Sequence, residues 1–386
     1  MKIKSIQPVR VRAPEPKTKT KPRRQSYNNT AKRAFPINKY PEFPRQLRQI
    51  PGEVAGEMWV KITAENGEWG LGQCHWGNLV SALIKEHFAP LLVGRDCLAI
   101  EYLNDLMWRS TLRFGAVGLS SVARSAIDLA LWDLKGKLLK LPVYSLIGGP
   151  CRPHLDCYCT SDDLDWSMEL GFKAFKISNP VHYEEGTDGI NRIEEKVAKA
   201  RETVGASADL MLNPVMSYNV EFAARVMERL KPYHLRWIEE PLVPNDMQGL
   251  SQLKKAVPTL PLATGEDHHS RHEFREMVER RCVDVLQPDL RWCGGLSEVL
   301  KIYTIGEAAG IATIPHSGAG LPFGQHFSIA MPESPLAEFW LGSDPGVPLA
   351  EANRFLGMPT PVDGKVTPSD APGFGMEFTA ENIEPW

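Results

Sequence analysis

The sequence predicts an α/β protein in which a closed barrel of parallel strands follows a smaller α+β domain. After Gly149, seven strand-like segments alternate with helix-like segments. Strands that alternate with helices form parallel sheets, and a series this long favours a closed barrel over an open, doubly wound sheet. The strand-like segments are 174–178, 209–213, 236–240, 261–266, 283–289, 311–317 and 337–341. A chain of 386 residues has room for both units, since a domain takes about 150 residues.

The first part of the chain carries strand patterns of a different kind. Segments 2–12 and 56–74 alternate apolar and polar residues, and Asn66-Gly67 divides the second segment into a hairpin. Across 120–139, apolar residues recur at spacings of three and four, which predicts a helix that ends before the next proline. We therefore expect an antiparallel sheet with one long helix.

A basic loop, residues 17–48, separates the first strand from the hairpin. It holds ten lysines and arginines against one acid, Glu42, and its four prolines interrupt any regular element. A loop of this length is uncommon in a compact domain unless it covers a site or is disordered. The sequence leaves two readings open: a solvated loop, or a lid over an anionic substrate.

The composition is that of an ordinary globular protein. Hydrophobic residues make up 43% of the chain and charged residues 24%, and the net charge of −3 gives no general attraction to nucleic acid. No apolar run is long enough to cross a membrane, and the N-terminus lacks a hydrophobic signal region. Seven cysteines, an odd number, are expected to be reduced. We expect a cytoplasmic protein with no nucleic-acid or membrane partner.

Each predicted barrel strand ends in a polar residue that strand propensity does not explain. Consecutive members of this set are 22 to 37 residues apart, about one strand-helix unit. The set consists of Lys176, Asn213, Glu239, Glu266, Asp289, His316 and Glu338. Because active sites of such barrels form at the carboxyl ends of the strands, we expect these side chains to surround one cavity.

The types of these residues suggest a reaction. Asn213, Glu239 and Glu266 offer only oxygen atoms, which suits Mg²⁺. Asp289 and His316 can form a hydrogen-bonded pair that acts as a general base. A carboxylate substrate held by the metal would lose its α-proton to this base, because the metal stabilises the enediolate that forms.

These residues lie in segments that together resemble the enolase superfamily, mandelate racemase branch, and most closely the L-rhamnonate dehydratase family. The similar segments span nearly the whole chain and are AIDLALWDLKGKLLKLPVYSLIGG, RWIEEP, TGE, QPDLRWCGGL, IPHSGAG and SPLAEF. The resemblance implies a modified TIM barrel, (β/α)7β, at 141–355. It also implies an α+β capping domain built from 1–140, which includes the basic loop, and from a C-terminal segment, 356–386, that returns to it.

The resemblance also implies roles for individual residues. It makes Asn213, Glu239 and Glu266 the Mg²⁺ ligands, with Asn213 in place of the usual aspartate and hence weaker binding. His316 with Asp289 becomes the base, and Glu338, if protonated, hydrogen-bonds the substrate carboxylate. Further substrate contacts are expected from Lys176, Arg48, Ser178, Asp267 and His268. Ser178 stands where racemases of this branch carry a second catalytic lysine, which favours elimination over racemisation.

The sequence therefore predicts a Mg²⁺-dependent lyase that removes water from an aldonate and gives a 2-keto-3-deoxy acid. Two alternatives remain open at this point: a racemase or epimerase of a 2-hydroxy acid, and a degenerate barrel that binds sugar acids without turnover. A carboxylate small molecule is the expected partner, together with further copies of the same chain in a homo-oligomer.

Overall fold

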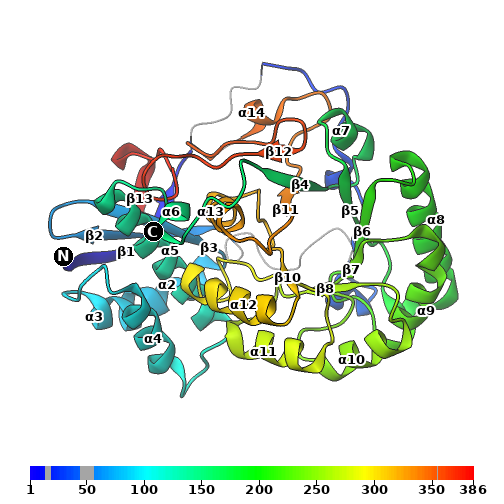
Figure 1. Ribbon diagram of the computed structural model, residues 1–386, viewed down its shortest axis with the longest axis horizontal. Helices are drawn as coiled ribbons and strands as arrows, with labels where there is room; N and C mark the ends of the chain where they lie inside the picture. Colours follow the sequence, from blue (N-terminus) through cyan, green and yellow to red (C-terminus); the bar gives the residue numbers. More distant parts are fainter. Residues whose placement is uncertain (14–18, 44–55, 354) are drawn as a thin grey trace.

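The computed structural model describes residues 1–13, 19–43, 56–353 and 355–386. It contains an antiparallel sheet with its helices and a barrel of parallel strands (Figure 1). The barrel helices α8 to α12 form an arc outside the strands β5 to β8, and both chain termini lie with the antiparallel sheet. The α/β fold class with a capping sheet is confirmed.

The antiparallel sheet joins the two ends of the chain. Its strand order is β13-β1-β2-β3, and β13 pairs with β1 through Val11 and Ile383. The predicted hairpin is present, and Gly67 adopts a φ of 90° in its turn, a conformation that favours glycine. The strands are β1 Ile3–Val11, β2 Met58–Ala64, β3 Trp69–Cys74 and β13 Ile383–Pro385.

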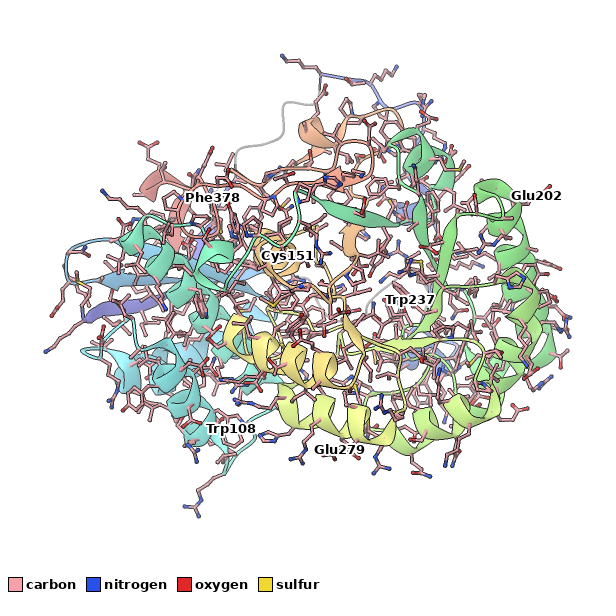
Figure 2. The ribbon with its side chains drawn as sticks, in the orientation of Figure 1. Trp108, Cys151, Glu202, Trp237, Glu279 and Phe378 are labelled. Atoms are coloured by element: carbon pink, nitrogen blue, oxygen red, sulfur yellow. The ribbon has the colours of Figure 1, made fainter. Side chains whose placement is uncertain are left out.

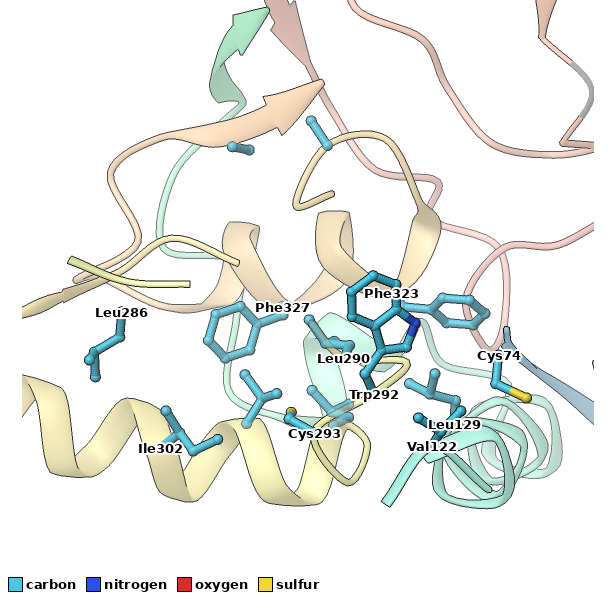
Figure 3. Packing of buried hydrophobic residues seen from close by; sticks show 14 of the residues in the cluster. Cys74, Val122, Leu129, Leu286, Leu290, Trp292, Cys293, Ile302, Phe323 and Phe327 are labelled. Carbon is cyan, nitrogen blue, oxygen red and sulfur yellow. The ribbon is translucent and has the colours of Figure 1, made fainter. Parts of the chain in front are cut away.

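The predicted long helix, α5 (Leu119–Leu139), lies between this sheet and the barrel and is buried on most sides. A Cβ atom at Gly70 would stand 2.2 Å from the Ala130 carbonyl oxygen, so glycine allows β3 to approach the helix closely. On the barrel side, the Trp132 indole donates to Ser297 at 2.9 Å. Figure 3 shows α5 side chains such as Leu129 beside Trp292 and Phe323 in one continuous core.

The barrel has eight strands, as (β/α)7β implies, and one more than the strand-helix alternation of the sequence indicated. The uncounted strand is β4 (Leu155–Thr160), and the helix that follows it, α7 (Leu164–Glu169), has only six residues, too few for a clear helical period. The strand order is β10-β9-β8-β7-β6-β5-β4-β11, with β12 (Lys365–Val366) antiparallel to β4. The segment after β10 meets β11, because the amides of Ala319 and Gly320 donate to the Glu338 carbonyl.

Several strands are shorter than predicted, so some of the polar residues lie in loops just beyond them. Glu266 follows the last residue of β8 by two positions, and Asp289 and His316 follow β9 and β10 by three. The remaining barrel strands are β5 Ala174–Ser178, β6 Asp209–Asn213, β7 Trp237–Glu239, β8 Leu262–Thr264, β9 Val285–Leu286, β10 Ala312–Thr313 and β11 Ala337–Trp340.

Helices complete both units. Those of the barrel are α8 Gly186–Val204, α9 Val220–Leu230, α10 Met247–Ala256, α11 Ser270–Arg280, α12 Leu296–Ala308 and α13 Pro322–Ala330. The other helices are α2 Gly77–Ala82, α3 Ala89–Leu92, α4 Ile100–Thr111, α6 Val143–Leu146 and α14 Leu349–Ala352. Short helical turns are η1 Tyr27–Asn29, η2 Pro36–Lys39, η3 Leu83–Phe88, η4 Tyr183–Glu185, η5 Lys231–Tyr233 and η6 Ala380–Asn382. In the described part of the chain, no helix is long and apolar enough to span a membrane.

The described part of the basic loop, residues 19–43, is fastened to an acidic turn of the barrel. Arg24 binds Asp163 at 2.5 Å and Asp165 at 2.6 Å, and the Tyr27 amide donates to Asp163. At least one of the loop cations is therefore neutralised by the protein itself. Arg48 lies outside the described residues.

Candidate active site

A cavity of about 520 Å³ opens at the carboxyl ends of the barrel strands. This volume is typical of a small-molecule site. Figure 2 labels Trp237, on β7, inside the arc of barrel helices. Six of the residues predicted from the sequence line the cavity: Lys176, Ser178, Asn213, Glu266, His316 and Glu338.

His316 and Asp289 form the predicted pair. His316 Nδ1 lies 2.7 Å from Asp289 Oδ2, and Nε2 lies 3.3 Å from Glu266 Oε1. Asp289 is buried and also accepts hydrogen bonds from Arg291, whose positive charge helps to hold the pKa of Asp289 below its usual range against the effect of burial. Because an ionised carboxylate only accepts, His316 Nδ1 is the donor, and Nε2 is the atom left for proton transfer.

The charge of His316 depends on the carboxylates around it. Burial alone would lower the pKa of this imidazole, but Glu266, Glu338 and Asp289 outweigh burial and raise the pKa to about 9. A general base must be neutral when it takes a proton, so this site needs a positive charge near Glu266 before His316 can act as a base at neutral pH.

Glu338 is paired with Lys176. Its Oε1 atom lies 2.7 Å from Lys176 Nζ and accepts from Thr160, and Oε2 accepts from the Ser317 amide at 2.9 Å. Burial raises the pKa of Glu338, but Lys176 and His316 more than compensate and lower it to about 2. The carboxyl group is therefore ionised, contrary to the protonated form that a hydrogen bond to a substrate carboxylate would need.

Glu239 is enclosed by donors rather than open to the cavity. Its side chain is 2% exposed, and Lys176 Nζ and the Asn213 amide nitrogen both bind Oε1. The other oxygen, Oε2, accepts from Trp237 at 3.1 Å and from Gln287 at 2.8 Å. A carboxylate has about four lone-pair positions, and all four are used here.

The side chain of Asn213 stabilises the local backbone, in addition to its predicted role as a metal ligand. Its carbonyl oxygen accepts a 2.7 Å hydrogen bond from the amide of Val215. Val215 has a φ of 49°, a left-handed conformation that is unusual for a β-branched residue. The amide of Asn213 thus stabilises a strained turn with its oxygen and binds Glu239 with its nitrogen.

The three predicted metal ligands fit a hard cation in donor type, and the two glutamates also fit it in charge. The Lys176 ammonium on Glu239 shows that this carboxylate is placed to hold a positive charge, and Glu338 offers the same ammonium a second acceptor. Asn213 fits less well, since its oxygen already binds Val215. Glu239 could hold a cation only if it gave up its contact with Lys176, and Glu338 already offers that ammonium group another acceptor.

Two predicted substrate contacts lie away from the cavity. His268 is buried, its Nε2 atom lies 2.9 Å from the Pro244 carbonyl, and burial lowers its pKa to about 4. The Asp267 amide faces Glu240, and among the described residues neither Asp267 nor His268 lines the cavity. The short β8 strand explains this difference, because the chain turns away directly after Glu266.

The sequence did not indicate several residues that do line the cavity. They are Asn28, Arg33, Phe35, His75, Asp162 and Trp340, among others. Three of them belong to the basic loop, so part of this loop forms a wall of the site. The Asn28 amide nitrogen binds both Ser161 and the Leu341 carbonyl, which holds the loop against the barrel. The excess of positive charge was a signal for the loop and for its cations, Arg33 among them, but not for Asn28 or Phe35.

Comparisons with known proteins match both parts of the chain. Residues 51–148 match the mandelate racemase / muconate lactonizing enzyme N-terminal domain, and residues 163–382 match the enolase C-terminal domain-like family. The chain is 36% identical over 352 residues to an L-rhamnonate dehydratase of Saccharopolyspora erythraea, with 90% of each chain covered.

Solved structures show the same similarity. The crystal structure of L-rhamnonate dehydratase from Gibberella zeae has a TM-score of 0.89 and 31% identity, covering 99% of this chain and 94% of that chain. A structure of rhamnonate dehydratase from the same organism, complexed with Mg, has a TM-score of 0.88 and 31% identity, covering 99% and 95%. The resemblance inferred from the sequence is confirmed.

Proposed function

Because this chain belongs to the mandelate racemase / muconate lactonizing enzyme family, we propose that it is a hydro-lyase that dehydrates a sugar acid. The observation that carries this proposal is the His316–Asp289 pair, held at 2.7 Å, with the second imidazole nitrogen at the cavity. An aldonate such as L-rhamnonate is the first-choice substrate, since L-rhamnonate dehydratases are among the relatives.

His316 has two tasks in this reaction. Its Nε2 atom takes the proton from C2 of the aldonate, and the electron pair of the broken C–H bond forms the enediolate. The same imidazole then returns the proton to the 3-hydroxyl group, which leaves as water when the C3–O bond breaks. The enol that remains takes a proton at C3 and becomes a 2-keto-3-deoxy acid.

We propose Mg²⁺ as the cofactor, held by Glu239, Glu266 and, more weakly, Asn213. When bound, Mg²⁺ would polarise the substrate carboxylate and offset the charge of Glu266. With that charge offset, Glu266 would raise the pKa of His316 less, and the imidazole would be nearer to the neutral form that a base needs. Lys176, which pairs with Glu338 as well as with Glu239, lines the cavity and would face an anionic substrate.

Turnover of a panel of aldonates in D₂O tests the reaction. A dehydratase gives loss of water, a semicarbazide-reactive 2-keto acid and deuterium at C3. An epimerase gives deuterium at C2 with every hydroxyl retained, and a non-catalytic barrel gives binding without either change. Mass spectrometry separates the three outcomes, and either of the last two would contradict the proposal.

A further inference from the structure

Asp163, between β4 and α7, is a buried carboxylate whose hydrogen-bond partners come from the basic loop. Its side chain is 0% exposed, and it accepts from Arg24 at 2.5 Å, from the Tyr27 amide at 3.0 Å and from the Ser26 hydroxyl group. It stands directly before α7, yet within the described residues its carboxylate makes no hydrogen bond to the barrel. Since a buried carboxylate without partners is costly, the loop and Asp163 stabilise each other.

The two residues before Asp163 also bind the loop, and they line the cavity. Asn28 of the loop donates to Ser161 Oγ at 3.1 Å and accepts from the Asp162 amide at 3.1 Å. Ser161, Asp162 and Asn28 all belong to the cavity wall. The carboxylate that fastens the loop is therefore the direct neighbour of this wall in the chain.

The docked loop brings further side chains to the cavity. The Arg33 guanidinium donates to the backbone and side-chain oxygens of Asn28, at 3.3 and 3.2 Å, and the Ala34 amide donates to the Asn179 carbonyl just beyond β5. Arg33 and Phe35 line the cavity, and among the loop cations that the structure describes Arg33 is the one that does so. Release of the loop would thus remove one wall and a positive charge that favours an anionic ligand.

We propose that Asp163 is a positioning residue that keeps residues 24–35 docked against the barrel, and that ligands of the cavity bind only when this segment is docked. Asp163 and the ligand then act on the same equilibrium between a docked and a released loop. A ligand that binds only the docked form suppresses release by a factor of one plus the ratio of its concentration to its Kd. The role of Asp163 is independent of the reaction, whereas the choice of an aldonate as ligand rests on the proposed function.

Trypsin cleavage after Arg33 in the folded protein, mapped by mass spectrometry, measures release of the loop. Asp163→Asn keeps an acceptor for the Tyr27 amide but removes the charge that binds Arg24. It should speed this cleavage about tenfold, since a hydrogen bond to a charged group contributes roughly that factor, with little change in melting temperature. The matched control is Asp165→Asn, which removes the exposed carboxylate 2.6 Å from the same guanidinium and should speed cleavage no more than about twofold.

Arg24→Gln removes the loop side of the same pair. It should give the same increase in cleavage after Arg33, and it replaces Asp163→Asn if that variant fails to fold.

Protection by a ligand supplies the second measurement. In His316→Asn protein, L-rhamnonate at ten times the Kd found by calorimetry should slow cleavage after Arg33 about tenfold, with and without Asp163→Asn. Cleavage after Arg113, in the exposed turn that follows α4, should respond neither to the substitution nor to the ligand.

Equal cleavage in the Asp163→Asn and Asp165→Asn proteins would overturn the role of Asp163. Unchanged cleavage after Arg33 at saturating L-rhamnonate would overturn the link to ligand binding, because a loop with a purely structural attachment is cleaved at the same rate with or without ligand. If the His316→Asn protein binds no member of an aldonate panel, the proposed function fails, and the comparison of the two aspartate variants still decides the role of Asp163.

Discussion

Two regions beside the cavity, here called the His316 corner and the Glu239 corner, contain ionisable groups that the sequence identified. They differ in how many atoms of those groups are still free to accept or donate a hydrogen bond. At the His316 corner, Nδ1 is bound to Asp289 while Nε2 faces Glu266 and the cavity. At the Glu239 corner, four donors fill the carboxylate, and Asn213 is one of them. An aspartate at position 213 would have no proton to donate there. The amide of Asn213 thus supplies one of the four hydrogen bonds that close this corner, beside those from Lys176, Trp237 and Gln287.

The largest expected effect comes from removing the cation of the closed corner. Lys176→Met would leave the Glu239 and Glu338 carboxylates buried without an ammonium group. Breaking a buried ion pair in this way costs about 3–5 kcal/mol of folding free energy. Denaturant unfolding of the metal-free protein measures the loss.

An exposed pair provides the control for this experiment. Lys231→Met removes the partner of Glu228 on the surface and should cost under about 1 kcal/mol. If the two variants lost equal stability, Lys176 would not be the charge that holds this corner together. A second change, Glu239→Gln in the Lys176→Met protein, should recover part of the stability, because it removes one of the two stranded charges.

The stability of the protein at acidic pH tests the contribution of Glu338, which shares Lys176 with Glu239. Its pKa falls from the usual 4.5 to about 2, so the folded state favours the ionised form. A carboxyl group with a lowered pKa stabilises the fold above pH 4.5, and this contribution is lost as the pH falls from 4.5 to 2. In urea titrations, Glu338→Gln should flatten this part of the pH profile, and an unchanged slope would contradict the pairing.

At the His316 corner, substitution of the imidazole is expected to change kcat rather than the stability of the fold. His316→Asn should lower kcat on the true substrate by at least about 100-fold, which corresponds to about 2.7 kcal/mol, because the transfer of the C2 proton loses its base. The melting temperature should change little. His234→Asn, at an exposed position with a φ of 47° that asparagine tolerates, is the matched control. Normal kcat in His316→Asn would remove the residue from the mechanism.

The difference between the corners also shows what the sequence was able to predict. Strand-helix alternation and the in-phase polar residues predicted the barrel and five side chains that line the cavity, because both follow from local patterns, whereas the sixth, Ser178, was indicated by the family resemblance. The strand β4 escaped notice since α7 is too short to show a helical period. Asn28, His75 and Asp162 reach the site through contacts between distant segments, and no local pattern reports such contacts.

The smallest expected change in free energy comes from Asn213→Asp, which places a carboxylate beside Glu239. Aspartate can still accept the hydrogen bond from Val215, but it cannot donate to Glu239, so two carboxylates would face each other across the 2.7 Å contact that Asn213 now makes. Without a cation this repulsion should lower the melting temperature. With Mg²⁺ the added charge should tighten Mg²⁺ binding about tenfold, or about 1.4 kcal/mol, as measured by calorimetry.

Asn191→Asp on the exposed face of α8 makes the same change of charge away from the site and should alter neither the melting temperature nor the Mg²⁺ affinity. If Asn213→Asp left Mg²⁺ affinity as it is in the unaltered chain, Asn213 would not belong to the cation site. The closed network around Glu239 would then be the permanent form of this corner and not a resting state that a cation opens.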